Sequence, residues 1–535
     1  MQIRKKFIAI ILISIILTAC SIFQKYDKQE LIQNSPKKYR ADIEKALEKA
    51  GDNKDELLQV LAHYQNDTKK LEAASFLIAN MKDHKYVEVG IFDSLDNQIK
   101  YNVLDYDNYH QIKDFLDSVE VERGELKWDK VLEEKDVETI SADLLIDNID
   151  LAFQAYNTLA WTQNLGWQTF LEFILPYRGS SEPLSDWRAY FWKKFASIRD
   201  TISDPLNLAN KINQKCREMF KFKDVYYMHP TDQGLPEMLE TGAGRCEDMT
   251  NFTIYAMRAN GLAVTSDYTP HWPNRSNNHA WNALILGEDK AIPFMGAEAD
   301  PGEYSLGKPV AKVYRKLFFK AENTLAEKLS ENEKAPAWLS GNNFRDVTPA
   351  YTETADMDIE YLKPQNRFAY LAIFNSNQWK AIDWAVIDSS ANASFQDMGT
   401  AINYLPMYYR ESDSLTDDEG KPKWELIPAS NPILLSKVKK IHIFSNDSLK
   451  LRDRCKNDFV LNKIPGGLEI EAEKQFQLLI WANDDWQTIV DTTTQTDSLL
   501  LEKYYKNSLY KLQHDPEDDE KIKLFTIQED SLISW

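Results

Sequence analysis

Two short stretches decide the fold of this chain: residues 242–250 read GAGRCEDMT, and residues 277–282 read NNHAWN. After Cys246, the apolar side chains that fall on one helical face are Met249, Phe252, Ala256 and Ala259. Gly261 then stands where helices often end with a residue in the left-handed conformation. The spacing therefore predicts a helix that starts at Cys246 and ends before Gly261.

A cysteine on the first turn of a helix meets the conditions for a nucleophile. Exposed N–H groups and the positive helix end favour thiolate over thiol, and Gly242 and Gly244 let a substrate backbone come close. Glu247 and Asp248 share this turn and would oppose the thiolate if they pointed at the sulfur. Successive helical positions diverge by about 100°, so we expect both carboxylates to stabilise the helix start instead.

His279 lies at one end of a predicted β-hairpin. The apolar run 283–286, the polar run 287–290 and the run 291–294 are typical of strand, turn and strand. The pKa of a histidine lies near working pH. His279 is therefore a candidate to take the proton of Cys246 and to return it to a leaving amine.

With these motifs the sequence resembles the transglutaminase-like superfamily, whose core has a papain-like α/β fold. The resemblance covers roughly residues 205–345. It rests on the Gly-x-Cys helix start, the later His-x-Trp strand and the helix exit at 259–264. It implies a cysteine enzyme with Cys246 as nucleophile and His279 as general base. The layout is also similar to lipid-anchored, transglutaminase-domain proteins of Bacteroides-type bacteria.

The sequence departs from the family at the third catalytic position. Family members usually carry Trp-x-x-Phe-Asp in the second hairpin strand, and here Met295 follows Phe294. No acid therefore occupies the expected site.

A carboxylate further along is the replacement that strand pairing favours. If residues 288–289 form the turn, opposed residues have numbers that sum to 577, and Glu298 faces His279. We therefore predict that Glu298 orients the imidazole, with Asp300, on the same strand face, as the alternative. Asn282 lies three positions from His279 and so on the opposite face.

Other polar and aromatic residues near these motifs are weaker candidates. His271 and Trp272 belong to a loop that either walls the substrate groove or has a turn and packing role. Tyr226, Tyr227 and His229 precede the nucleophile helix and are candidates for an oxyanion hole with the Cys246 N–H.

The remaining cysteines and histidines predict no further chemistry. Cys216 sits in a helical run and is expected to be buried, whereas Cys455 lies among charges without a nearby histidine. No two histidines fall at ligand spacing, so we expect no metal site and no cofactor, and nothing indicates the calcium sites of some animal transglutaminases.

The N-terminus resembles a bacterial lipoprotein signal peptide. Basic residues at 4–6 precede an apolar run from Phe7 to Leu17 that is short for a bilayer span, followed by Thr18-Ala19-Cys20. Cleavage before Cys20 and acylation of its thiol would anchor the protein in a membrane. By resemblance to enterobacterial sorting, Ser21 after the cysteine favours the outer membrane, facing either the periplasm or the cell surface.

The sequence pattern predicts a multidomain α+β protein with a helical N-terminal domain and two C-terminal β-sandwiches. The family resemblance implies a papain-like core between them. Residues 373–382 line up with 480–489 at a constant offset of 107, and each copy is typical of a strand, polar turn and strand. The expected boundaries are a signal peptide at 1–20, a polar linker at 21–35, a helix-rich domain at 36–200, the core at 201–345, and sandwiches at 346–434 and 435–535.

Composition excludes one class of partner. The chain has 63 basic and 83 acidic residues, a net charge of −20, whereas binding to a phosphate backbone needs a basic footprint. We therefore expect no nucleic acid partner. The membrane is expected as a partner through the lipid anchor.

Two functions of different class remain open. In the first, Cys246 attacks an amide or peptide carbonyl of a protein, peptide or peptidoglycan-like substrate, and hydrolysis is the simpler outcome. In the second, the core is catalytically silent, and the sandwiches bind a glycan or protein through aromatic side chains. The aromatic candidates for this second function are Trp379, Trp384, Tyr404, Tyr408 and Tyr409.

Overall fold

The computed structural model describes residues 27–535, except 274, 288–289, 362–365, 417–420, 445–458, 466, 503, 515–521, 529–530 and 535. The predicted signal peptide and Cys20 lie outside the described residues, as does Cys455. The chain forms two compact units that alternate along the sequence. The first holds residues up to 212, 219–248 and 255–263, and the second holds 213–218, 249–254 and 264 onward.

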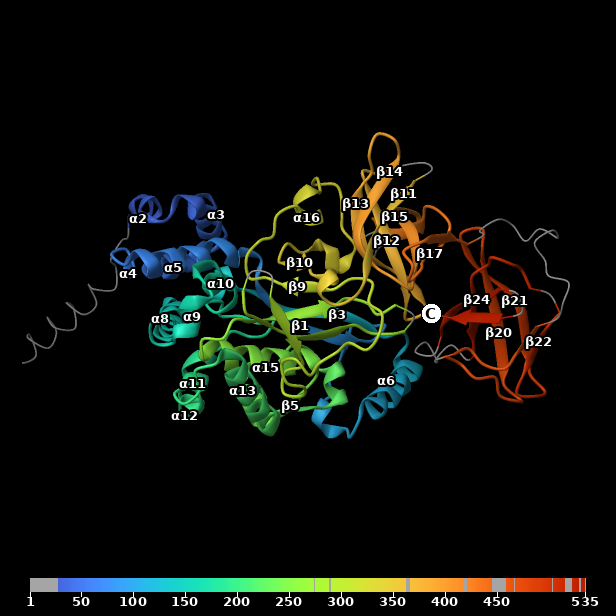
Figure 1. Ribbon diagram of the computed structural model, residues 1–535, viewed down its shortest axis with the longest axis horizontal. Helices are drawn as coiled ribbons and strands as arrows, with labels where there is room; N and C mark the ends of the chain where they lie inside the picture. Colours follow the sequence, from blue (N-terminus) through green and yellow to red (C-terminus); the bar gives the residue numbers. More distant parts are fainter. Residues whose placement is uncertain are drawn as a thin grey trace, which may run out of the picture. The chain divides into compact units, whose positions relative to one another are not determined.

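The first unit confirms the helix-rich N-terminal region. Its main helices, labelled in Figure 1, are α2 (Lys28–Asn34), α3 (Arg40–Lys49), α4 (Lys54–His63), α5 (Thr68–Asn80), α8 (Ala142–Thr158), α10 (Trp167–Phe173) and α11 (Trp187–Lys194). The apolar face of α3 is buried and includes Ile43, Ala46 and Leu47. In α2, Leu31 and Ile32 are buried as well, so the part expected to be a polar linker contributes to this core. None of the helices in the described part of the chain is long and apolar enough to cross a membrane.

The same unit contains a sheet that the helical patterns did not predict. Strand β1 (Lys85–Phe92) pairs antiparallel with β2 (Gln98–Ile99) on one side and with β3 (Lys127–Lys135) on the other. Helix α6 (Tyr109–Arg123) lies between β2 and β3 in the chain. Strand β3 is exposed along most of its length, so it shows no apolar alternation by which the sequence could mark it as a strand.

The transglutaminase-like core consists of helices α13 (Pro205–Met219), α14 (Leu235–Thr241) and α15 (Cys246–Ala259) and a five-stranded sheet. The strands are β6 (Val264–Thr269), β7 (His279–Ile285), β8 (Ala291–Phe294), β9 (Tyr314–Lys316) and β10 (Phe344–Asp346), in the order β10-β9-β6-β7-β8. The predicted helix after Cys246 is confirmed, and Gly261 beyond its end has φ +71°. The predicted hairpin is confirmed as β7 and β8.

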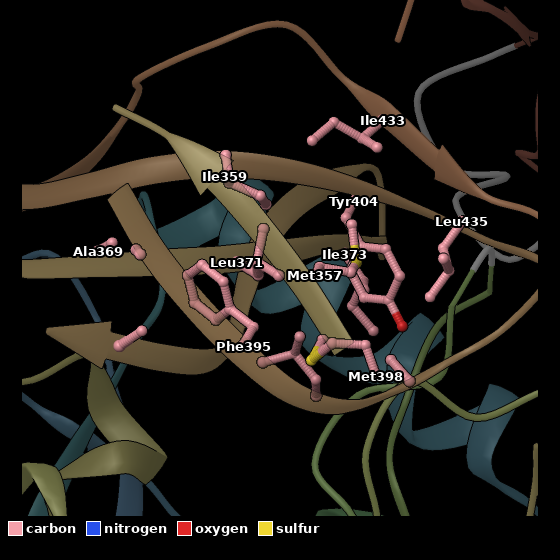
Figure 2. Close-up of a cluster of buried hydrophobic side chains, with 14 of the residues drawn as sticks. Met357, Ile359, Ala369, Leu371, Ile373, Phe395, Met398, Tyr404, Ile433 and Leu435 are labelled. Atoms are coloured by element: carbon pink, nitrogen blue, oxygen red, sulfur yellow. The ribbon is translucent and has the colours of Figure 1, made fainter. Parts of the chain in front are cut away.

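Two β-sandwiches follow the core, and both belong to the second unit. In the first, β11 (Thr354–Glu360) pairs with β14 (Asn392–Gly399). The facing sheet contains β12 (Phe368–Asn375), β13 (Gln378–Val386), β15 (Ile402–Thr416), β16 (Pro422–Pro428), β17 (Ile433–Leu435) and β18 (Ile441–Ile443). Figure 2 shows the core between the two sheets, where Met357 and Phe395 from one sheet meet Leu371 and Tyr404 from the other. Strand β18 extends this sandwich beyond the expected boundary at 434.

The second sandwich repeats the hairpin of the first. Strands β20 (Gln475–Ala482) and β21 (Asp485–Thr493) pair as β12 and β13 do, and each hairpin has a register shift at equivalent positions, after Leu371 and after Leu478. In both two-residue turns the residues have positive φ, Ser376 and Asn377 in one and Asn483 and Asp484 in the other. Such turns match the twist of the strands. The offset of 107 residues thus relates two hairpins of the same build.

The second sandwich has a core of its own. Strands β19 (Phe459–Leu461) and β22 (Leu499–Leu501) form its small sheet, and β23 (Tyr510–Gln513), β24 (Leu524–Gln528) and β25 (Ser531–Ser534) complete the larger one. The two repeated hairpins also pack together, with the rings of Trp379 and Trp481 at 5.8 Å and those of Phe374 and Trp486 at 5.9 Å.

Gly399 marks a close approach of two backbone segments. A Cβ atom there would lie far inside van der Waals contact with the Val310 carbonyl oxygen and 3.0 Å from its carbon. We expect Gly399→Ala to lower the free energy of unfolding by about 1–3 kcal/mol because one segment must shift. Thermal unfolding checks this, with Gly341→Ala as the control, since the nearest atom to that Cβ is 3.8 Å away in the Phe344 ring. Equal melting temperatures for the two variants would contradict the prediction.

Candidate active site

Cys246 is the first residue of α15, so its position at the helix start is confirmed. A buried carboxylate sets this start, because Asp248 accepts hydrogen bonds from the N–H of Arg245 at 2.9 Å and from the N–H of Gln233 at 2.9 Å. Gly244 makes room for it, since a Cβ there would lie 2.6 Å from the Asp248 side chain. Gly244 is therefore required for the helix cap.

The carboxylates of the first turn behave differently from each other. Asp248 points away from the sulfur and caps the helix, as expected. Glu247 does not, because its Oε2 lies 3.8 Å from the Cys246 Sγ and accepts a hydrogen bond from the thiol. The expectation that both carboxylates turn away from the thiol was wrong for Glu247, since a long side chain can fold back toward its neighbour whatever the direction of its Cα–Cβ bond.

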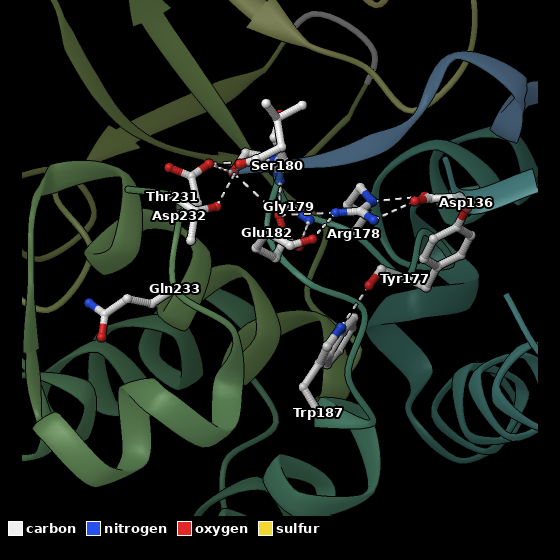
Figure 3. Close-up of polar contacts among 12 residues, drawn as sticks. Asp136, Tyr177, Arg178, Gly179, Ser180, Glu182, Trp187, Thr231, Asp232 and Gln233 are labelled. Atoms are coloured by element: carbon white, nitrogen blue, oxygen red, sulfur yellow. Dashed lines mark hydrogen bonds and ion pairs between the residues drawn. The ribbon is translucent and has the colours of Figure 1, made fainter. Parts of the chain in front are cut away.

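A chain of charged groups holds the segment before α15 in place. Arg245 forms an ion pair with Asp232 at 2.6 Å, and the hydroxyl of Ser180 donates to the same carboxylate at 2.6 Å. Glu182 accepts hydrogen bonds from the N–H groups of Gly179 and Ser180, both at 2.7 Å. Figure 3 shows the loop at 179–182 between Asp232 on one side and the ion pair of Arg178 with Asp136 on the other.

Arg178 completes the chain of charges on its other side. Its guanidinium is buried and forms an ion pair with Asp136, which is also buried. Burial lowers the pKa of Arg178, but the charges of Asp136 and Glu182 outweigh this effect and raise it. The arginine therefore stays charged, and removing one partner would leave a buried charge uncompensated.

His279 begins β7 in the second unit, opposite Thr269 of β6. Its Nε2 lies 2.9 Å from the hydroxyl oxygen of Tyr304, within hydrogen-bond distance. The imidazole stacks on the Trp272 ring, with centroids 6.1 Å apart and 25° between the planes, and it also contacts the ring of Trp281. Aromatic rings and one hydroxyl group thus fix the orientation of this histidine.

The register of the β7–β8 hairpin differs by one residue from the prediction. Asn282 pairs with Phe294 and Leu284 with Ile292, so opposed numbers sum to 576. Strand β8 ends at Phe294, and Met295 and Ala299 then close a turn on which Glu298 is exposed. The pairing argument that placed Glu298 opposite His279 therefore does not hold.

Asp300, the alternative acid, is bound to α13. It accepts hydrogen bonds from the side-chain amides of Asn213 and Gln214, both at 2.9 Å, and pairs with Arg217 at 2.8 Å. The side-chain amide of Asn282 donates to the Thr250 carbonyl of α15 at 3.1 Å. Tyr304 is the residue that sequence reasoning missed, because nothing in its local pattern marks it.

The structure adds little support for a catalytic role of the weaker candidates. Burial lowers the pKa of His271 to about 4, with Lys380 adding to the effect, so it is a poor base near neutral pH. Burial lowers the pKa of His229, but its hydrogen bonds to the Glu237 carboxylate at 2.9 Å and to the Thr231 carbonyl, together with nearby negative charges, raise it above its ordinary value. Cys216 is buried, as predicted, and burial raises its pKa to about 12. Tyr226 is buried and Tyr227 exposed.

No metal centre is found in the described part of the chain. None of its groups of histidine, cysteine, aspartate and glutamate side chains has three or more members placed to hold an ion.

The fold and the two motifs define a class of protein, a papain-like core with a cysteine at a helix start and a histidine at the start of a strand. Residues 194–294 match the model of the transglutaminase-like superfamily, so the chain contains a domain of this superfamily. The match includes Cys246 and His279 and ends with β8, before Glu298, Asp300 and Tyr304. No curated protein matches the chain.

The Asp248 cap predicts a pH-dependent stability. Burial, together with the charge of Asp232, raises the pKa of Asp248 from 3.8 to about 6. A raised pKa in the folded protein stabilises it below the pKa of the unfolded chain, and this contribution is lost as pH rises through about 6. In Asp248→Asn this loss is absent. We therefore expect the unfolding free energy of the variant, minus that of the wild type, to increase between pH 4 and 7 by at most about 3 kcal/mol.

Chemical denaturation at several pH values measures this difference. Asp93→Asn is the control, because hydrogen bonds from Asn97 lower the pKa of that aspartate and reverse the sign of its contribution. A difference for Asp248→Asn that stays flat or falls across this range would contradict the prediction.

Proposed function

We propose that this protein is a cysteine enzyme of the transglutaminase-like type that cleaves an amide or peptide bond. The observation that carries the proposal is the position of Cys246 as the first residue of a buried helix with a fixed cap. The superfamily match, which covers both Cys246 and His279, supports it.

In the proposed reaction, His279 removes the proton from the Cys246 thiol, and the sulfur attacks the substrate carbonyl. The C–N bond breaks as the imidazolium returns the proton to the departing amine, which leaves a thioester on Cys246. Water, deprotonated by His279, then attacks the thioester, and the acid and the free thiol are released. An amine in place of water would give acyl transfer by the same steps.

We further propose that Tyr304 orients His279 in place of the acid found in other family members. If Nε2–H donates to the Tyr304 hydroxyl, the tautomer is fixed and Nδ1 is the atom that exchanges the proton with sulfur. A hydroxyl supplies orientation without the negative charge of a carboxylate, so it stabilises the imidazolium less than an aspartate would.

The proposed location is the cell envelope, with the membrane reached through an acylated Cys20. The basic, apolar and Thr18-Ala19-Cys20 segments of the N-terminus support this. Proteins and peptidoglycan-like polymers of the envelope are the substrates that such a location would offer.

The alternative function, a silent core with binding sandwiches, loses several of its aromatic candidates. Tyr404 and Tyr408 are buried in the first sandwich core, and Trp379 packs between the two repeated hairpins. Tyr404 and Tyr408 therefore have no exposed face for a sugar to cover, whereas Trp379 is partly buried and contributes to the packing of the two hairpins.

Thiol labelling tests the proposed nucleophile. We expect iodoacetamide to label Cys246 with a midpoint well below the pKa of about 8.5 of a free cysteine, because the helix start and the imidazolium of His279 favour the thiolate more than the Glu247 carboxylate opposes it. Cys216 should stay unlabelled. In His279→Gln the midpoint should move toward 8.5, because the thiolate loses its proton acceptor. Mass spectrometry of labelled peptides across pH measures both. A wild-type midpoint at or above 8.5, or no change in His279→Gln, would rule out the proposed pair.

Tyr304→Phe tests the orienting role, because it removes the hydroxyl and keeps the ring. We expect the labelling midpoint of Cys246 to rise and the rate at neutral pH to fall by about tenfold, the loss of one hydrogen bond to a charged group. Tyr351→Phe is the matched control: its ring also contacts Trp281, at 5.2 Å, but its hydroxyl binds Asp267. If the Tyr304→Phe profile coincides with that of the wild type, Tyr304 has no such role.

A further inference from the structure

A small cavity in the second unit is lined mainly by cationic side chains. Its volume is about 210 Å³, and its lining residues are Arg275, Ser276, Asn277, Lys308 and Lys523. Among the residues that the structure describes, no carboxylate lines it. The chain as a whole has a net charge of −20, whereas the lining of this cavity carries three cations.

The loop that carries Arg275 is held in place by the first sandwich. The side-chain amide of Asn375, at the end of β12, donates to the carbonyls of Trp272 at 2.9 Å and Asn277 at 3.0 Å. The N–H of Ser376 donates to the Arg275 carbonyl at 3.3 Å. The backbone around the cavity is therefore fixed before any ligand binds, which lowers the entropy lost on binding.

A stack of three side chains connects the cavity to His279. The guanidinium of Arg275 lies 5.1 Å from the centre of the Trp272 ring, and the other partner of that ring is the imidazole of His279. Trp272 is buried, so the stack is rigid. A ligand held by Arg275 would thus lie at a fixed distance from the imidazole.

Two of the cations that line the cavity, Arg275 and Lys308, are available to an external anion. In the part of the chain that the structure describes, neither Arg275 nor Lys308 forms an ion pair with a carboxylate, and both are at least partly exposed. Arginine presents a planar set of donors that matches a carboxylate or a phosphate, and lysine adds a point charge. The lining supplies donors and positive charge, which is the complement of an anionic group.

We propose that Arg275, Lys308 and Lys523 form a subsite for an anionic group of the substrate, a carboxylate or a phosphate. The role of this subsite rests on the proposed function. The bound anion would position an acyl donor so that its amide lies at Cys246 and His279. The enzyme would then prefer acidic peptides, or peptides with a free terminal carboxylate, over neutral ones.

Binding to the full chain with Cys246→Ala tests the subsite without turnover. The probes are inorganic phosphate, an N-acetylated dipeptide with a free C-terminal carboxylate and the same dipeptide as its amide, each titrated by calorimetry. We expect the carboxylate to bind at least tenfold more tightly than the amide, and affinity to fall as salt rises. Tighter binding of phosphate than of the carboxylate would assign the anion as a phosphate.

Charge-neutral variants identify the residues. Arg275→Gln and Lys523→Gln should each weaken binding of the preferred anion about tenfold, whereas Lys423→Gln, an exposed position on β16, should leave it unchanged. Equal binding of carboxylate and amide with no binding of phosphate, or equal losses in all three variants, would overturn the proposal. Labelling of Cys246 is independent of these titrations, so failure of the subsite and failure of the nucleophile are separate results.

Discussion

The start of helix α15 depends on one buried carboxylate. Asp248 ties the N–H groups of Gln233 and Arg245 together, and it fits only because Gly244 has no side chain. This cap satisfies donors at the helix start that would otherwise be unpaired, and it determines where Cys246 stands. If Asp248 were removed, the first turn would lose both its cap and its link to the segment before α14, and the thiol would lose a defined position.

The groups behind this cap form a network that is costly to break. Arg245, Asp232, Ser180, Glu182 and Arg178 follow one another through hydrogen bonds and ion pairs within the first unit, and most of them are buried. Buried ion pairs add little to stability by themselves, but removing one member leaves an uncompensated charge in a medium of low polarity. Their effect here is to keep the backbone before Cys246 in a single conformation. A nucleophile benefits from that rigidity because its geometry is set before substrate binds.

The first sandwich helps to position His279, the proposed base of the candidate site. The turn of the β12–β13 hairpin extends Asn375 to the loop at 272–277, and this loop carries Trp272, which stacks on His279. The C-terminal domains are therefore more than appended modules: one of them fixes a wall next to the imidazole. The same turn also contacts the second sandwich, where the amine of Lys511 on β23 donates to Asn377 at 2.7 Å.

The sequence by itself determined the helix and hairpin of the candidate site and the repeated hairpins of the sandwiches, because local periodicity and turn residues occupy consecutive positions. Helix α15 with its end at Gly261, the β7–β8 hairpin and the repeated hairpins at an offset of 107 all follow from such patterns. Only the tertiary structure decided which side chains meet. The β7–β8 pairing differs by one residue from the predicted register, and β8 ends at Phe294. Both features accompany a turn in which Gly296 packs closely on Thr253 and Asn282, residues that are distant in sequence. For the same reason Tyr304, and not a predicted acid, lies against His279. A contact between distant residues depends on the packing of whole elements, and a single sequence carries no local signal for it.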